Sequence, residues 1–173
     1  IPFGVFIPED DLETKRRPIP LPDIRNIQAE CFDCDDDKRW LLALISDSGM
    51  RLSEACGLLV EDIKIDTQIP YLDIKPHPWR RLKTKGSARL LPLVGSSLWA
   101  AQRTVANATG EFAFPRYCND TAVKANSASG SLNKWLSQRV PSGCVVHSFR
   151  HSFRDRLREV QCPADIIDAL GGW

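Results

Sequence analysis

Two arginines, a histidine and a tryptophan are the residues of this chain best suited to chemistry. Arg51 lies in an upstream segment, His147 and Arg150 open a later stretch, and Trp173 is the last residue printed. A guanidinium group binds two phosphate oxygens at once and keeps its charge at any working pH. The sequence places no carboxylate cluster or P-loop nearby. It therefore predicts phosphoryl transfer on a nucleic-acid backbone, without a metal or another cofactor.

Four short segments with chemically distinctive residues follow one another between residues 51 and 173. They are Arg51-Leu-Ser-Glu54, Lys83-Thr-Lys85-Gly-Ser-Ala-Arg89, His147-Ser-Phe-Arg150-His151 and Leu170-Gly-Gly-Trp173. One motif of this length occurs by chance in many chains, whereas four in this order, with these separations, are specific. On these segments the chain resembles the catalytic domain of a tyrosine recombinase of the phage integrase family.

The resemblance implies a site-specific DNA recombinase that cleaves and rejoins strands through a 3′-phosphotyrosyl intermediate, for integration or excision of a phage or mobile element. Arg51 and Arg150 would hold the scissile phosphate as negative charge builds on its oxygens. His147 would accept or donate a proton beside the attacking oxygen, and Trp173 would donate its indole N–H to the phosphate.

The resemblance also implies a general acid and supporting residues. Lys83 is preferred over Lys85 as the acid that protonates the 5′-oxygen, because Lys83 keeps the spacing of phage-type relatives. Glu54 would orient His147, and His151 would support the site from the same helix.

The family's nucleophilic tyrosine follows the position of Trp173. Tyr71 and Tyr117 are the tyrosines printed here, and they match nothing catalytic in the family. The expectation is a fragment that lacks its nucleophile and the preceding DNA-gripping domain, and that does not cleave DNA alone. Two alternatives stay open, a type IB topoisomerase-like enzyme and a DNA-binding remnant that has lost catalysis.

Charge is segregated along the chain although the net charge is only +1. Residues 9–37 are rich in acids, whereas residues 74–110 contain no Asp or Glu. This segregation predicts a basic face for double-stranded DNA. The resemblance implies that other recombinase protomers bind the same DNA. The expected DNA contacts are Arg80, Arg81, Arg89 and Arg154.

Bulk properties fit one globular domain. A length of 173 residues and a hydrophobic content of 43% allow a sizeable core. No apolar run approaches the roughly 20 residues of a membrane span. The six cysteines are scattered, and the close pair Cys31 and Cys34 has no second pair to complete a zinc site. Reduced thiols and a bacterial cytoplasmic location are expected.

The periodicity predicts a mostly α (α+β) fold, with helices around a small antiparallel sheet. Residues 1–22 are expected to form a proline-rich linker, and residues 23–173 the catalytic domain. Asp23 and Ser53 are expected to cap helices. A buried stripe beside a polar face that carries Arg150 is predicted by apolar residues at helical spacing after His147, namely Phe149, Phe153, Leu157 and Val160. The expected helices cover residues 23–31, 38–46, 53–58, 96–108, 122–139, 147–160 and 163–170, and the strands 63–65, 70–74 and 88–92.

Overall fold

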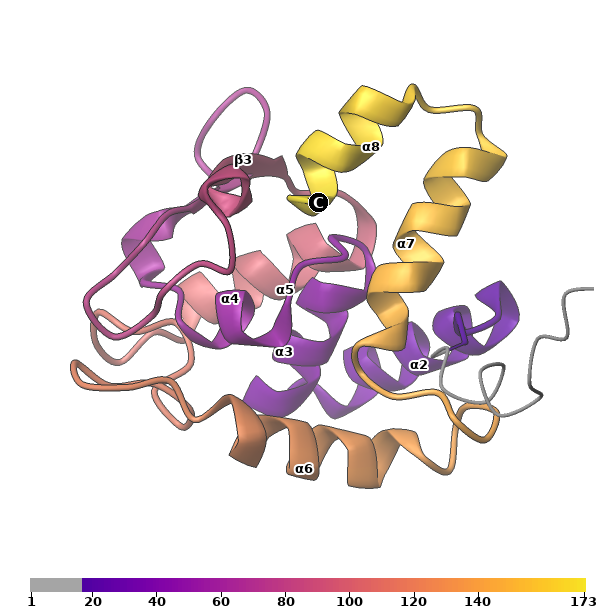
Figure 1. Ribbon diagram of the computed structural model, residues 1–173. Helices are drawn as coiled ribbons and strands as arrows, with labels where there is room; N and C mark the ends of the chain where they lie inside the picture. Colours follow the sequence, from indigo (N-terminus) through magenta and orange to yellow (C-terminus); the bar gives the residue numbers. More distant parts are fainter. Residues whose placement is uncertain (1–16) are drawn as a thin grey trace, which may run out of the picture.

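Helices surround a small antiparallel sheet in the computed structural model, which describes residues 17–173 (Figure 1). The predicted mostly α class with a small sheet is confirmed. The helices are α2 (Leu21–Cys34), α3 (Asp37–Ser46), α4 (Leu52–Cys56), α5 (Gly95–Ala106), α6 (Ala125–Leu136), α7 (Ser148–Glu159) and α8 (Ala164–Gly171), with 3-10 turns η1 (Val60–Asp62) and η2 (Lys85–Ser87).

The sheet contains β1 (Ile63–Lys64), β2 (Tyr71–Ile74) and β3 (Arg89–Pro92), in the order β1-β2-β3. Leu72 on the central strand lies opposite Ile63 on one side and Leu91 on the other. All three side chains are buried, so one face of the sheet packs on the core. On its free side β3 lies beside α8, which brings the end of the chain next to the sheet (Figure 1).

Helix α3 forms the centre of the core. Its residues Leu41, Leu42, Ala43, Leu44 and Ile45 are all at most 1% exposed. A helix that is apolar all round must be covered on every side. Helices α2, α4, α5 and α7 supply that cover. Helix α4, which carries Glu54, and helix α7, which carries Arg150, therefore both pack against α3.

Two predicted helix caps are wrong. Helix α2 begins at Leu21, with Pro20 as its N-cap, so Asp23 lies inside the first turn. Proline is compatible with the first turn of a helix, and Pro22 therefore does not delay the start. Ser53 likewise lies within α4, whose N-cap is Arg51. Of the predicted linker, residues 1–16 lie outside the described residues.

Helix α6 is shorter than the expected 122–139. Its N-terminal side is held in a turn, where the side chain of Asn119 accepts hydrogen bonds from the backbone of Thr121 and Ala122. Cys118 then pairs with Val123 in an isolated bridge, so the helix starts only at Ala125. These local side-chain bonds compete with helix formation, as Asn commonly does.

Within residues 17–173, no helix has the length and hydropathy to cross a bilayer. The same residues contain no group of three His, Cys, Asp or Glu side chains placed to hold a metal ion. All six cysteines are free thiols.

Candidate active site

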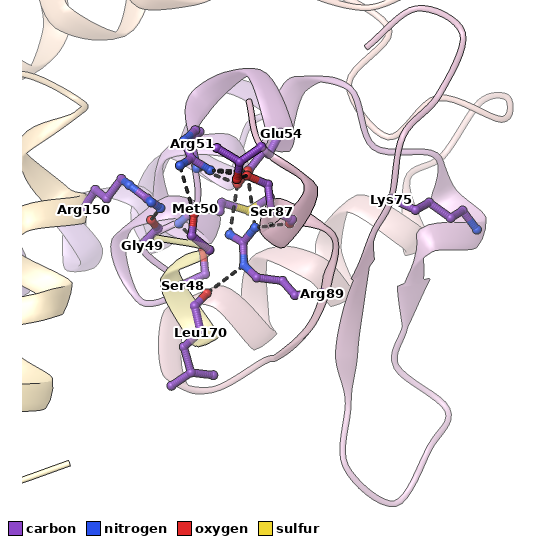
Figure 2. Close-up of polar contacts among 12 residues, drawn as sticks. Ser48, Gly49, Met50, Arg51, Glu54, Lys75, Ser87, Arg89, Arg150 and Leu170 are labelled. Carbon is purple, nitrogen blue, oxygen red and sulfur yellow. Dashed lines mark hydrogen bonds and ion pairs between the residues drawn. The ribbon is translucent and has the colours of Figure 1, made fainter. Parts of the chain in front are cut away.

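Arg51 stands at the start of α4 and is fixed by contacts from three parts of the chain (Figure 2). Its Nη1 donates to Glu54 Oε1 at 2.8 Å and to Ser87 Oγ at 3.2 Å, and its Nη2 donates to the Gly172 carbonyl at 3.0 Å. None of the hydrogen bonds that Arg51 makes within the described chain uses its Nε–H. This donor can therefore serve a phosphate oxygen.

Glu54 is the buried anchor of the site, and its side chain is 3% exposed. It accepts the backbone N–H of Arg51 at 2.9 Å, and Arg89 Nη2 reaches its Oε2 at 3.0 Å. Burial alone would raise the pKa of this carboxyl, but the hydrogen bonds and charges of Arg89 and Arg51 outweigh it and hold the pKa below its ordinary value. Glu54 therefore stays charged and orients both guanidinium groups. Its expected contact with His147 remains a prediction.

Arg150 projects from α7 into the protein and is 4% exposed. Its Nη1 donates to the Gly49 carbonyl at 2.9 Å, whereas its Nη2 is buried with no hydrogen-bond partner in the described chain. Burial, together with a smaller effect of the nearby Arg51 charge, lowers the pKa of Arg150 to about 10. The expectation that Arg150 lies on a polar helix face is thus wrong. A buried cation with a free donor is costly unless an anion binds it.

Arg51, Lys83 and His147 line one cavity of about 380 Å³. Helix α6 contributes Asn133 to the same wall. The Asn133 side chain also accepts the backbone N–H of Val146 at 2.8 Å, which fixes the residue before His147. The cavity thus collects the cation, amine and imidazole that the sequence places far apart.

Lys83 and Lys85 are both exposed but are placed differently. Lys83 belongs to the lining of the cavity, whereas Lys85 starts the turn η2 and is absent from that lining. His151 lies one helical turn beyond His147, with the two ring centroids 5.4 Å apart. The placement of Lys83 supports the choice of this lysine over Lys85.

Trp173 packs its ring against two arginines. The guanidinium carbon of Arg150 lies 4.4 Å from the ring centroid, and that of Arg154 lies 4.9 Å away. Arg154 also lies 3.7 Å from Asp168, and Trp173 itself is 40% exposed. Stacking of this kind positions the indole beside Arg150. Its donation to a phosphate remains a prediction.

The predicted DNA contacts Arg80 and Arg89 are wrong, because both side chains are buried and bind groups of the protein itself. Arg80 is 3% exposed and donates to the backbone carbonyls of Glu54 and Lys75. The Arg89 side chain is 6% exposed and binds Glu54. Arg81, by contrast, is exposed.

Two further cations of the acid-free stretch 74–110, Lys75 and Arg103, form ion pairs within the protein. Lys75 lies 3.1 Å from Asp62, and Arg103 makes two bonds to Asp35 at 2.8 and 2.7 Å. In Figure 2 Lys75 lies well away from the arginine cluster. The basic surface is therefore smaller than the charge count of this stretch indicates.

Sequence reasoning missed two participants. Ser87 is fully buried and accepts from Arg51, and the carbonyl of Gly172 does the same. Ser87 lies inside the lysine segment and Gly172 inside the final motif, so position along the chain was an available signal. Neither tyrosine joins the site, since Tyr117 is 3% exposed with a buried hydroxyl and Tyr71 belongs to β2.

Known proteins share this fold and sequence pattern. Residues 23–173 match the model of the phage integrase family. The Tn1549 transposon integrase in complex with transposon right-end DNA has a TM-score of 0.70 and 17% identity, over 98% of this chain and 62% of that chain. XerA recombinase has a TM-score of 0.69 and 12% identity, over 99% of this chain and 57% of that chain. XerH site-specific recombinase bound to its difH substrate in a pre-cleavage complex has a TM-score of 0.64 and 16% identity, over 90% of this chain and 48% of that chain.

This chain thus spans less than two thirds of each of these solved chains. No curated protein sequence matches it significantly. The family model covers nearly all of the residues that build the fold and the site. The chain belongs to the phage integrase family.

Proposed function

We propose that this chain is the catalytic part of a site-specific DNA recombinase that integrates or excises a phage or mobile element. The observation that carries the proposal is the cavity shared by Arg51, Lys83 and His147, with Arg150 anchored on the segment that leads into Arg51. These groups supply charge, a proton donor and a proton acceptor around one phosphate.

In the proposed reaction, a tyrosine hydroxyl attacks the scissile phosphorus and the bond to the 5′-oxygen breaks. His147 accepts the tyrosine proton, and Lys83 gives a proton to the departing 5′-oxygen. The Arg51 guanidinium and the unpartnered Nη2 of Arg150 neutralise the non-bridging oxygens at the pentavalent stage. A 5′-hydroxyl of a second strand then reverses the step. The energy of the broken bond is kept in the phosphotyrosyl link, so the step consumes no nucleotide.

The partners under this proposal are double-stranded recombination sites and further protomers of the same recombinase. The Tn1549 integrase and XerH structures are complexes with DNA, which supports a DNA partner here. The proposed compartment is the bacterial cytoplasm, where DNA is accessible and thiols stay reduced.

The test is covalent capture of DNA by the product of the complete reading frame. That protein is incubated with duplexes nicked beside the target site and then separated by denaturing electrophoresis. A covalent band together with exchange between two sites supports the proposal. Relaxation of supercoiled plasmid without exchange would instead identify a type IB topoisomerase. Binding without any covalent band would identify a DNA-binding remnant.

A further inference from the structure

Arg89 ties together three segments that are distant in the chain. Its Nε donates to the Leu170 carbonyl at 2.7 Å, at the end of α8. Its Nη2 binds Glu54 Oε2 at 3.0 Å, and its Nη1 binds the Ser87 carbonyl at 2.7 Å and approaches Glu54 Oε1 at 3.3 Å. Every nitrogen of this nearly buried guanidinium is therefore engaged (Figure 2).

These contacts surround Arg51 without touching it. Glu54 and Ser87 both bind the Arg51 guanidinium through their side chains, and Gly172, two residues beyond Leu170, binds it through its carbonyl. Arg89 thus holds all three segments that orient Arg51. It also packs against Gly172, where an added Cβ would lie 2.9 Å from Arg89 Nη1.

We infer that Arg89 is a positioning residue, which joins the seating of residues Leu170–Trp173 to the orientation of Arg51. The inference rests on the proposed function for its meaning in catalysis. The linkage itself stands on the contacts above. Arg89 does not bind DNA in this proposed role, and it acts on Arg51 only through Glu54 and the end of α8.

The planar guanidinium is essential to this role. Its forks reach Glu54 on one edge and Leu170 through Nε on another, whereas a lysine offers a single nitrogen. Arg89→Lys should therefore keep one charged contact and lose the bridge. Arg89→Met loses both. Arg103→Lys is the matched control, because Arg103 makes an equally complete fork with Asp35 away from the site.

The first arm of the test measures amide hydrogen exchange in the 173-residue chain. The backbone N–H of Trp173 donates to the backbone carbonyl of Asp168 at 3.1 Å and reports on the end of α8. Arg89→Lys should speed exchange of this amide by at least about tenfold, the expected loss for one charge-assisted bond. The central helix α3 should keep its protection. Wild-type exchange at Trp173 in both Arg89 variants would overturn the inference.

The second arm measures the pH profile of DNA cleavage by the product of the complete reading frame. Glu54 is faced by the charges of Arg51, Arg89, Arg80 and Arg150. Removing Arg89 leaves burial as the prevailing influence, so the pKa of Glu54 should rise. Cleavage by Arg89→Met should then fall at a higher pH than cleavage by wild type as the solution is acidified.

Two further variants make this second arm specific. Adding Glu54→Gln to Arg89→Met removes the titrating group and should abolish the shifted acid limb, whereas Arg103→Lys should keep the wild-type profile. An Arg89→Met profile identical to wild type would overturn the inference. If the wild-type protein cleaves nothing, the proposed function fails, and the exchange arm still decides whether Arg89 links the segments.

Discussion

At the scale of single residues, Arg150 and Arg51 are the cations best placed to bind an anion. Arg150 is nearly buried, and burial lowers its pKa to about 10, yet one of its donors has no partner in the described chain. It remains charged at neutral pH. The charge of Arg51 contributes to this lowered pKa, so holding Arg150 charged beside it is costly in the free protein. A phosphate between them would offset that cost.

Lys83 supplies a residue-scale prediction. Under the proposed function, Lys83→Ala in the product of the complete reading frame should slow cleavage of an ordinary phosphodiester by about 10²–10⁴-fold, the usual contribution of a general acid. A substrate with sulfur at the 5′-bridging position should be spared, because a thiolate leaves without a proton. Lys85→Ala is the matched control and should cleave both substrates normally. Rescue by sulfur for Lys85→Ala and not for Lys83→Ala would show that Lys85 is the acid.

Gly49 supplies a second residue-scale prediction. Its φ is +62°, and a Cβ built there would lie 2.4 Å from the ring of Phe153. Gly49→Ala should lower the free energy of unfolding by about 2–4 kcal/mol, from strain and overpacking. Gly130 lies within α6 with open space around it, so Gly130→Ala should raise stability by up to about 1 kcal/mol. Urea denaturation measures both. Equal stability of the two variants would contradict the packing assigned to Gly49.

At the scale of elements, Asp47 joins helices that are remote in sequence. It follows α3, accepts the backbone N–H of Ser96 at the start of α5 at 2.8 Å, and pairs with Arg156 of α7 at 2.9 Å. Its residue is 8% exposed, so both contacts are sheltered from water. The helix that carries Arg150 is thereby fixed to the core by one carboxylate.

Asp47→Ala should therefore lower the free energy of unfolding by about 1–3 kcal/mol, as expected for a lost helix cap and a sheltered ion pair. Asp155→Ala is the control. Asp155 lies 3.8 Å from Arg158, and both side chains are more than half exposed. Its loss should change stability by less than about 1 kcal/mol. Thermal unfolding compares the two, and an equal loss in both would argue against the junction at Asp47.

Local patterns predicted which helices and strands form better than they predicted where these begin and end or where the charged side chains point. The apolar run in α3 and the order of strands and helices could be predicted, because burial and periodicity are local properties. The caps of α2 and α4 could not, since Pro20 and Arg51 are unusual N-caps. Val160 was expected in the buried stripe but is 74% exposed, because α7 ends at Glu159.

The direction of each arginine could not be predicted either. Arg80 and Arg89 look like neighbours of Arg81 on a basic strip. Their partners are carbonyls and a carboxylate brought close by folding, and Glu54 is 35 positions from Arg89 in the sequence. Of the predicted catalytic residues, Arg51, Lys83 and His147 line one cavity, whereas Arg150 and Trp173 are not part of its lining.

At the scale of the whole molecule, residues 74–110 expose fewer unpaired cations than their charge count indicates. Many cations are paired inside, and the exposed Arg81, Lys83 and Lys85 stay outside the ion pairs of the described chain. The 173-residue chain should therefore bind duplex DNA weakly. Its log affinity should fall by roughly 0.9 per log unit of salt for each phosphate contacted, hence by few such units in total. A salt titration by fluorescence anisotropy measures this slope, and salt-independent binding would contradict it.

The same chain should form no covalent link to a nicked duplex, since Tyr71 and Tyr117 lie outside the cavity. Denaturing electrophoresis with radiolabelled DNA checks this expectation. The matched sample is the product of the complete reading frame. A covalent band from the 173 residues alone would make one of these tyrosines, or another residue, the nucleophile.

In the proposed mechanism Arg51 and Arg150 hold one phosphate between them. A crystal structure of the chain with sulfate or vanadate would show whether they do. One tetrahedral or trigonal anion should bind within about 3 Å of the Nε and Nη2 of Arg51 and of the Nη2 of Arg150. An anion bound to only one of the two arginines, or guanidinium groups more than about 10 Å apart, well beyond two hydrogen bonds to one ion, would contradict the account.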